Sequence, residues 1–297
     1  MKFKLEGILP AILTPFKRGG SEIDFDKAAA WAEELARRGV HGIFMAGSSG
    51  EGLLMSIEER KQLACVLMDA VGRQIKVVVQ TGCLDVPRTI DLTRHALEIG
   101  AHAVSVYTPG FYRYDDDALY GHFALVAKAV PEMPLLLYNI PRYTGNTLSP
   151  ALIFKLGNGF DSIVGMKDSS GDIGHLGRVI AGAPKGFTVI NGADEFSYQA
   201  YLTGAAGSVA LTANVVPDLF LSIFDDVNKG KLDRALATQR RLNDVIDVLG
   251  GGAKISTYKE AVRLLGHDTG YVRPPQRELT ADEKKALRQA MKRIGLI

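Results

Sequence analysis

Cysteine is scarce in this sequence of 297 residues, which contains only two. Cys65 lies in a helical pattern and Cys83 lies just after a strand pattern. The apolar stretch within residues 1–16 is interrupted by Glu6 and two prolines, and no small-residue cleavage site follows it. We therefore expect no secretory signal. Two thiols without a secretory context are typical of reduced cysteines. The sequence therefore predicts a cytoplasmic protein without a disulfide.

Long apolar runs and an excess of one charge are also absent. No apolar run approaches the roughly 20 residues needed to cross a bilayer. A net charge of +2 provides no basic surface of the kind that nucleic acid or an anionic membrane requires. Hydrophobic residues make up 46% of the chain and charged residues 23%, which is typical of a globular protein. The expected partners are therefore small molecules, with no nucleic acid and no membrane.

Strand-like and helix-like segments alternate along most of the chain. The strand patterns occupy residues 7–13, 42–46, 76–80, 103–107, 135–139, 162–168, 187–191 and 206–210. A glycine that can end a helix recurs two or three residues before a strand, as at Gly39, Gly100 and Gly204, which indicates a repeated unit. Eight strands with eight crossovers predict an α/β fold, a (β/α)8 or TIM barrel carrying the active site, over residues 1–230. Helical patterns at 232–249, 258–265 and 280–293 predict a C-terminal helical appendage over residues 231–297.

Lys167 closes the apolar strand pattern of residues 162–168. Parallel strands are covered on both faces, so a lysine at the end of one lies at the rim of a buried region and is partly stripped of water. Such an amine loses its proton more easily and becomes a nucleophile toward carbonyl carbons. Lys167 is therefore the first candidate for a Schiff base. The alternative is a lysine that extends out of the sheet or pairs with the adjacent Asp168.

Lys167 is one of a group of residues, most of them polar, that end or follow the predicted strands. Because the catalytic groups of such barrels lie at the carboxyl ends of the strands, these residues are expected to converge on one mouth. They are Ser48, Ser49, Glu51, Tyr107, Phe111, Tyr112, Arg113, Tyr138, Asn139, Arg142, Tyr143, Lys167, Asp168, Ser169, Asn191, Asp194, Glu195, Thr212 and Asn214.

Two features of this group suggest a chemistry. The turn Gly47–Glu51 offers backbone N–H groups, two hydroxyls and a nearby helix N-terminus, which suit a carboxylate, although a plain glycine-rich turn has the same composition. Its glycine spacing differs from the dinucleotide-binding fingerprint, which argues against NAD. Tyr138 ends an apolar run, where its phenol could carry protons or simply pack with its hydroxyl satisfied.

The six histidines do not form a metal site in the sequence pattern. His41 and His102 precede their strands and so belong to the opposite mouth, while His95 and His122 lie within helical patterns. The two remaining histidines, at positions 175 and 267, are unassigned. We interpret all six as surface or packed side chains, and the sequence predicts no metal.

Several ordered motifs resemble one known family across essentially the whole chain. They are Gly47-Ser48-Ser49-Gly50-Glu51 for the family's Gly-Thr-Thr-Gly-Glu, Thr108-Pro109, Tyr138-Asn139-Ile140-Pro141 with Thr144-Gly145, and Gly165-Met166-Lys167-Asp168-Ser169. In these motifs the sequence resembles the dihydrodipicolinate synthase and N-acetylneuraminate lyase family of pyruvate-dependent class I aldolases.

The resemblance implies a role for each of the central residues. It implies that Lys167 forms the imine with pyruvate or another 2-keto acid, without a further cofactor, and that Tyr138 moves the proton. It implies that Ser48 and Ser49 hold the keto-acid carboxylate, and that the protein is a homotetramer or a dimer with active sites near an interface. The catalytic residues expected are Lys167, Tyr138 and Ser48, and the substrate-binding residues expected are Ser49, Gly47, Tyr112, Arg142, Tyr143, Ser169, Asn191, Asp194, Glu195 and Leu211.

The substrate is indicated by departures from the synthase pattern. Phe111 replaces the synthases' relay tyrosine, with Tyr112 next to it, and Tyr143 replaces their arginine, with Arg142 one position earlier. The stretch 191–195 is similar to the lyase segment that binds a polyhydroxylated tail, although Leu211 stands where sialic acid lyases carry a serine.

These features favour a lyase that joins or cleaves pyruvate and an aldehyde within a 2-keto-3-deoxy sugar acid. The stretch 212–215 resembles the synthases instead, so the alternative is a dihydrodipicolinate synthase, which condenses pyruvate with aspartate semialdehyde in lysine biosynthesis. A non-catalytic barrel that binds a keto acid is the alternative of another class.

Overall fold

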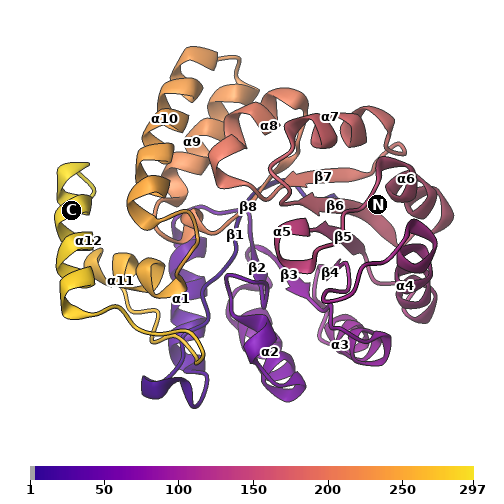
Figure 1. The fold of residues 1–297 in the computed structure, drawn as a ribbon, viewed down its shortest axis with the longest axis horizontal. Coiled ribbons are helices and arrows are strands. Elements are labelled where there is room, and N and C mark those ends of the chain that lie inside the picture. The colour runs from indigo at the N-terminus through magenta and orange to yellow at the C-terminus, as the bar shows by residue number, and fades with distance from the viewer. Residues whose placement is uncertain (1–3) are drawn as a thin grey trace.

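Eight parallel strands form the centre of the computed structural model, which describes residues 4–297 (Figure 1). The strands are β1 (Gly7–Pro10), β2 (Gly42–Met45), β3 (Lys76–Gln80), β4 (Ala103–Tyr107), β5 (Leu135–Asn139), β6 (Ile163–Asp168), β7 (Thr188–Asn191) and β8 (Gly207–Ala210). Their order is β1-β8-β7-β6-β5-β4-β3-β2, and a parallel bridge between Ala11 and Phe44 joins the first strand to the second. The predicted TIM barrel is confirmed.

Burial explains why the sequences of the strands are mostly apolar. Nearly every strand residue is buried, because side chains on one face fill the barrel and those on the other pack against helices. The register between β5 and β6 pairs Tyr138 with Lys167 and Asn139 with Asp168. The lysine and the tyrosine singled out in the sequence therefore end neighbouring strands at the same level.

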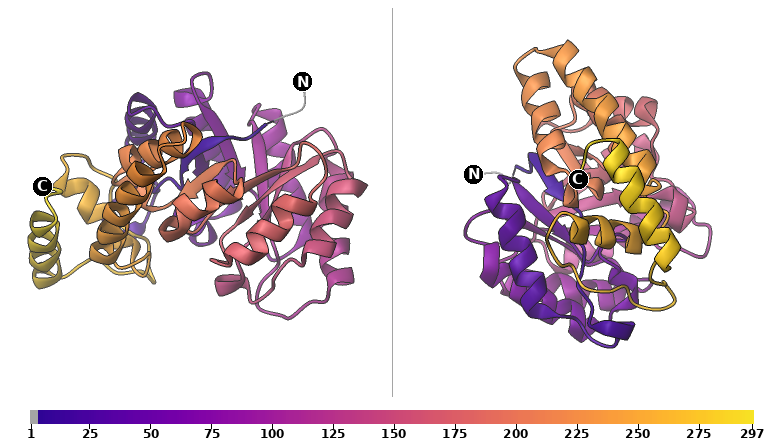
Figure 2. Two further views of the ribbon diagram at one scale, coloured as in Figure 1. Left: turned by 90° about the horizontal axis from the view of Figure 1, so that it is seen from above. Right: turned by 90° about the vertical axis from the view of Figure 1, so that its left-hand side faces the viewer.

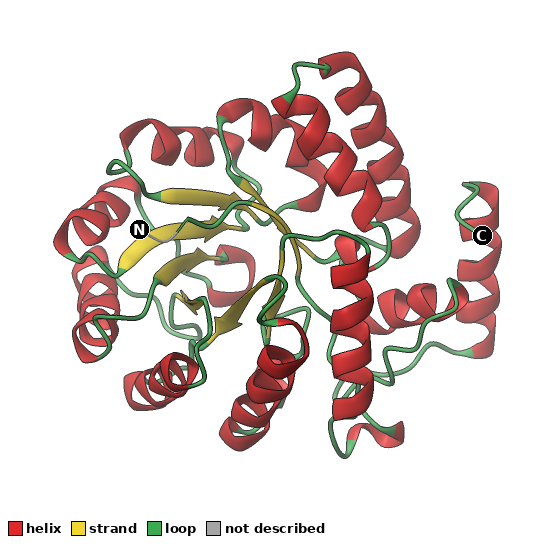
Figure 3. Ribbon diagram, turned by 180° about the vertical axis from the view of Figure 1, so that it is seen from behind, coloured by secondary structure: helices red, strands yellow, loops and turns green. Residues whose placement is uncertain are grey.

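Helices cover the outside of the barrel (Figures 1 and 3). They are α1 (Phe25–Arg37), α2 (Ile57–Val71), α3 (Val86–Glu98), α4 (Asp116–Ala129), α6 (Pro150–Gly159), α7 (Ile173–Gly182), α8 (Ser197–Thr203) and α9 (Pro217–Asn228). Ser56 caps α2 in a complete capping box with Glu59, as the sequence pattern indicates. Ser149 caps α6 through the N–H of Leu152, at 3.1 Å.

Short helical turns lie in several loops. They are η1 (Arg18–Gly20), η2 (Gly52–Leu54), α5 (Pro141–Thr144), η3 (Asp194–Phe196) and η4 (Thr212–Asn214). Four of them, η2, α5, η3 and η4, follow strands at the carboxyl mouth. These turns carry several of the residues expected at the active site.

The C-terminal helices stand beside the barrel (Figures 1 and 2). α10 (Leu232–Leu249) packs along α9, and α11 (Ile255–Leu264) and α12 (Ala281–Arg293) continue outward from it. The predicted boundary at residue 230 falls in the turn between α9 and α10. Within residues 4–297 no helix has both the length and the apolar character needed to cross a bilayer. No secretory signal is expected in residues 1–16, and residues 1–3 of that segment lie outside the described residues.

The structure differs from the predicted boundary of the first strand. β1 ends at Pro10 instead of residue 13, because Ala11 N–H still bonds β8 while Ile12 N–H turns to Phe44 O of β2, at 3.0 Å. After β7 the chain first forms the 3-10 turn η3 and becomes α-helical only at Ser197.

Candidate active site

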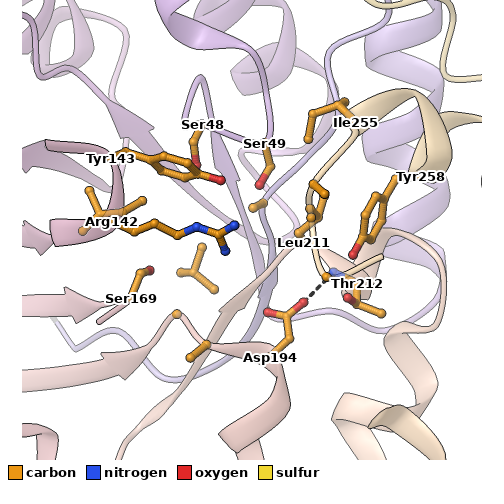
Figure 4. Close-up of a pocket in the computed structure, with 18 of the residues that line it drawn as sticks. Ser48, Ser49, Arg142, Tyr143, Ser169, Asp194, Leu211, Thr212, Ile255 and Tyr258 are labelled. Carbon is orange, nitrogen blue, oxygen red and sulfur yellow. Dashed lines mark hydrogen bonds between the residues drawn. The ribbon is translucent and has the colours of Figure 1, made fainter. Parts of the chain in front are cut away.

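A cavity of about 720 Å³ opens at the carboxyl ends of the strands (Figure 4). Ten of the thirteen residues expected at the site line it. They are Ser48, Ser49, Tyr138, Arg142, Tyr143, Lys167, Ser169, Asp194, Glu195 and Leu211. The rule that catalytic groups gather at this end of a barrel therefore locates the cavity correctly.

Lys167 and Tyr138 lie at the buried floor of the cavity. Their exposed fractions are 4% and 3%, and Lys167 Nζ donates a hydrogen bond to Tyr138 Oη at 3.1 Å. Lys167 Nζ also lies 4.3 Å from the centroid of the Phe44 ring and 4.2 Å from that of the Tyr138 ring. Asp168 binds His175 instead of the lysine, at 2.8 Å. The amine is thus held between aromatic rings with a phenol oxygen as its partner, an arrangement that can pass a proton between nitrogen and oxygen.

The turn Gly47–Glu51 places two hydroxyls at the rim. Ser48 and Ser49 both line the cavity, and Glu51 N–H donates to Ser48 O at 3.2 Å. A Cβ atom added to Gly52 would lie 1.8 Å from Ala46 O, so only glycine fits where the chain folds back. The turn is therefore held in one tight conformation with its hydroxyls beside the cavity.

Glu51 anchors this turn from beneath. Its Oε1 accepts a hydrogen bond from Lys259 Nζ at 2.7 Å, and its Oε2 accepts one from Arg273 N–H at 2.9 Å. Lys259 Nζ also donates to Thr14 O at 2.7 Å and to Tyr271 O at 2.5 Å. Burial raises the pKa of Glu51 and lowers the pKa of Lys259, although each charge opposes the shift of the other. The C-terminal appendage is thus linked by a buried ion pair to the turn Gly47–Glu51, which is called the serine turn below.

Asp194 and Thr212 form a polar wall opposite the serine turn. Thr212 N–H donates to Asp194 Oδ2 at 2.7 Å, and burial raises the pKa of Asp194 to about 6. Figure 4 shows the Tyr258 hydroxyl on the same side, with Leu211 between this wall and the serines. Burial also raises the pKa of Tyr258 above its ordinary value. This wall offers hydrogen-bond partners to a hydroxylated ligand.

Arg142 and Tyr143 enter the cavity from α5. The Arg142 guanidinium carbon lies 5.7 Å from the centroid of the Tyr143 ring. Figure 4 shows the guanidinium pointing into the middle of the cavity, between Tyr143 and Ser169. The short helix was not anticipated in the sequence, and it carries Arg142 to a position where a ligand carboxylate could meet it.

Three expected residues do not line the cavity that the described residues enclose: Gly47, Tyr112 and Asn191. Gly47 is the buried first residue of the serine turn, and a Cβ atom added to it would lie 2.7 Å from the Phe44 ring. Tyr112 is 64% exposed on the loop after β4 and packs edge-on against Phe111, with ring centroids 5.0 Å apart. The Asn191 amide donates to Ala193 O at 2.8 Å and so shapes the loop before Asp194. In place of direct ligand contacts, Gly47 and Asn191 shape the turns that carry the lining residues.

The outer wall of the cavity comes from residues that sequence reasoning missed. The appendage contributes Ile246, Gly251, Gly252, Ala253, Ile255, Tyr258, Pro275 and Gln276. The run of glycines at 250–252 between two helices is the only local mark of this contact. The cavity is therefore shared between the barrel and the appendage.

The histidines are packed or bound to the protein itself. His41 Nδ1 accepts Ile8 N–H and His102 Nδ1 accepts Val77 N–H, both at 3.1 Å, at the mouth opposite the cavity. Burial lowers the pKa of His122 to about 4. The ring of His175, which the sequence left unassigned, forms a hydrogen bond with Asp168 at the end of β6. Within residues 4–297 no group of three or more His, Cys, Asp or Glu side chains is placed to hold a metal ion.

Fold and cavity together are those of a TIM barrel with a candidate active site at the carboxyl mouth. A model of the dihydrodipicolinate synthetase family matches residues 4–294, and the chain belongs to this family of carbon–carbon lyases. A 4-hydroxy-tetrahydrodipicolinate synthase of Methanopyrus kandleri is 31% identical over 297 residues, which are 100% of this chain and 99% of the relative. An uncharacterized DapA-like lyase of Halobacterium salinarum is 33% identical over 293 residues, covering 99% of this chain and 95% of the relative.

Solved structures agree with the family. YagE, a prophage protein of the dihydrodipicolinic acid synthase family from E. coli K12 solved in complex with pyruvate, superposes with a TM-score of 0.93 at 29% identity, covering 99% of both chains. A dihydrodipicolinate synthase from Cyanidioschyzon merolae with lysine bound gives a TM-score of 0.93 at 28% identity, also covering 99% of both chains. Both likenesses extend over the barrel and the appendage.

Proposed function

We propose that this protein is a pyruvate-dependent class I aldolase in which Lys167 forms an imine with the keto carbon of pyruvate or another 2-keto acid. The observation that carries the proposal is the buried Lys167 Nζ, 3.1 Å from Tyr138 Oη at the floor of the cavity. A lysine held away from water is the usual nucleophile for a Schiff base. The pyruvate-bound relative supports a keto acid as the ligand.

The cavity supplies a role for each neighbouring group during cleavage. Lys167 Nζ displaces the keto oxygen of the substrate as water and forms the imine. The bond between the carbon next to the imine carbon and the hydroxyl-bearing carbon then breaks, and its electron pair forms the double bond of an enamine. Tyr138 Oη takes the proton of the hydroxyl that becomes the aldehyde. Ser48 and Ser49 hold the carboxylate of the keto acid at the rim. The enamine that cleavage leaves on Lys167 is then protonated at its terminal carbon by the proton that Tyr138 carries. Addition of water to the resulting imine releases pyruvate and regenerates the amine.

We favour a 2-keto-3-deoxy sugar acid as the substrate. A polyhydroxylated aldehyde needs several neutral or acidic hydrogen-bond partners, and Asp194, Glu195 and Tyr143 line the cavity beyond the lysine. One carboxylate oxygen of Asp194 also accepts a hydrogen bond from Thr212 N–H, which fixes the orientation of the Asp194 side chain. A site with fixed polar groups discriminates strongly against aldehydes that leave them unpaired.

A specific observation supports a second candidate, the condensation of pyruvate with aspartate semialdehyde. The guanidinium of Arg142 points into the cavity, where it could bind the second carboxylate of that aldehyde in a bidentate manner. Several relatives carry the name 4-hydroxy-tetrahydrodipicolinate synthase.

Side-by-side kinetics separate the two substrates. We expect kcat/KM for cleavage of a 2-keto-3-deoxy sugar acid to exceed that for aspartate semialdehyde by at least about tenfold, or ~1.4 kcal/mol. The deciding variant is Arg142→Ala, and the matched control is Arg113→Ala, which removes the same charge from a neighbouring loop outside the lining. A preference for aspartate semialdehyde that disappears only in Arg142→Ala would establish the synthase instead. Adduct formation without turnover of any aldehyde would indicate a keto-acid binder.

The assembly and location of the protein remain predictions. We expect a homotetramer or a dimer, which size-exclusion chromatography with light scattering measures directly. A strictly monomeric protein with full activity would contradict an active site that depends on a neighbouring subunit. We also expect a cytoplasmic location, which fractionation of the cells that make the protein would test.

A further inference from the structure

A closed ring of hydrogen bonds lies directly behind the proposed catalytic pair. The residues after Tyr138 and Lys167 are Asn139 and Asp168, which are opposite each other in the register of β5 and β6. Asn139 Nδ2 donates to Asp168 Oδ1 at 3.0 Å, which ties the two strand ends together. A change in this hydrogen bond would therefore shift the backbone at the residues next to Lys167 and Tyr138.

His175 and Leu148 complete the ring. His175 Nδ1 lies 2.8 Å from Asp168 Oδ2, and His175 Nε2 lies 2.9 Å from Leu148 O. Leu148 N–H in turn donates to Asn139 Oδ1 at 3.1 Å. The exposed fractions are 0% for Asn139, 2% for Asp168, 6% for His175 and 0% for Leu148. In such a dry environment each of these bonds is strong, and each unpaired group is costly.

The ring determines the protonation state of His175. Both of its partners, a carboxylate oxygen and a carbonyl oxygen, can only accept hydrogen bonds, whereas a neutral imidazole has a single N–H to donate. Only the imidazolium satisfies both. α7 packs against α6, α8 and β7, and the groups that act on the imidazole are Asp168 from β6, Asp172 from the start of α7 and the Leu148 carbonyl. The hydrogen bond to Asp168 is the largest cause of a raised pKa for His175.

We infer that the imidazolium of His175 is a positioning residue for the reaction, because it holds Asp168 and Asn139 so that Lys167 Nζ and Tyr138 Oη face each other. This inference rests on the proposed function. His175 is not one of the residues that line the cavity, and its ring bonds Asp168 and the Leu148 carbonyl, so it acts through the two strand ends. The carboxylate-binding serines lie on another loop, so its loss should affect proton transfer more than pyruvate binding.

The direction of the pH dependence follows from the raised pKa. The unfolded-state value for histidine is about 6.5, so the contribution of the ring is fully present below that pH. It is lost as the pH rises through the higher folded-state pKa of His175. Wild-type turnover should therefore decline on the alkaline side in step with the deprotonation of His175.

Two variants and one control test the positioning role. His175→Leu removes both bonds, while His175→Asn keeps a donor near the Nδ1 position without a titrating group. We expect kcat to fall about tenfold to a hundredfold in the leucine variant, with KM for pyruvate changed less than about threefold, because small misplacements of reacting groups have costs of this size. The asparagine variant should recover part of kcat. His102→Asn, which keeps an acceptor for Val77 N–H at the opposite mouth, should match wild type.

Nitrogen-15 NMR of labelled histidine gives a readout that a purely structural role would not change. The His175 signals, assigned by their loss in the asparagine variant, should show two protonated ring nitrogens on the acid side of a titration whose midpoint lies above the ordinary pKa of histidine, and this titration should coincide with the alkaline decline of kcat. A His175 pKa at or below the ordinary histidine value, or His175 variants with wild-type kcat and pH profile, would overturn the inference. If the leucine variant does not fold, the asparagine variant and the NMR titration decide.

The same experiment distinguishes this inference from the proposed function. Borohydride reduction of wild type with pyruvate reports on the imine alone. If wild type forms no adduct, the proposed function fails. If wild type forms the adduct and turns over while the His175 variants behave as wild type, only the positioning role fails.

Discussion

The ion pair between Lys259 and Glu51 predicts a large loss of stability from a single substitution. The side chain of Glu51 is 0% exposed and that of Lys259 is 2% exposed, with 2.7 Å between the charged atoms. Lys259→Met keeps a linear side chain of similar length but leaves the carboxylate buried with only Arg273 N–H as a partner. It also removes the hydrogen bonds that Lys259 Nζ donates to Thr14 O and Tyr271 O.

The expected cost is about 3–5 kcal/mol, the usual effect of removing one partner of a buried pair. At roughly 2–4 °C per kcal/mol for a chain of this order of size, the thermal midpoint should fall by about 6–20 °C. The double variant Glu51→Gln/Lys259→Met removes both charges together and should recover at least about half of this loss. Circular dichroism at fixed pH and protein concentration measures all three midpoints.

A matched control is available in the same appendage. Lys254 pairs with Glu283 at 2.7 Å, but the two side chains are 49% and 29% exposed. Lys254→Met should therefore shift the midpoint by less than about 4 °C, since exposed pairs contribute ~1 kcal/mol or less. The reasoning is refuted if Lys259→Met shifts the midpoint no more than this control, or if the double variant is as unstable as the single one.

Two further predictions concern the cavity. Tyr138→Phe should lower kcat about a hundredfold to ten-thousandfold while pyruvate still binds, and a loss of less than about tenfold in steady-state kinetics would show that another group carries the proton. Because burial raises the pKa of Asp194 to about 6, its carboxylate becomes protonated and a weaker acceptor as the pH falls through that value. The kcat/KM for a hydroxylated substrate should therefore decrease below about pH 6 in wild type. The variant Asp194→Asn, measured over the same pH range, should not show this decrease. An identical pH profile in both proteins would exclude Asp194 as the titrating group.

The barrel could be predicted from the sequence because its signals are local. Buried parallel strands appear as apolar runs, and helix ends carry recognisable caps such as Ser56 and Ser149. The carboxyl-end rule then assigns polar residues to one mouth without any knowledge of their contacts. Lys167 and Tyr138 were found in this way, because each ends an apolar strand.

What could not be predicted depends on contacts between distant segments. Glu51 and Lys259 are 208 residues apart, and nothing local to either position indicates the other. The same holds for His175, which was interpreted as an ordinary packed histidine because its partners, Asp168 and the Leu148 carbonyl, meet it only in the folded chain. Tyr112 was expected in the cavity because of its neighbour in sequence, but the loop after β4 turns it outward.

Trapping of the imine is the most direct test of the proposed chemistry. Wild-type protein incubated with pyruvate and reduced with borohydride should carry one covalent adduct, and peptide mapping by mass spectrometry should place it on Lys167. Lys167→Arg should remain folded by circular dichroism and carry no adduct, because a guanidinium stays protonated and is not a nucleophile. An adduct on any other lysine, or aldehyde turnover by wild type without an adduct, would contradict the assignment of Lys167 as the Schiff-base residue.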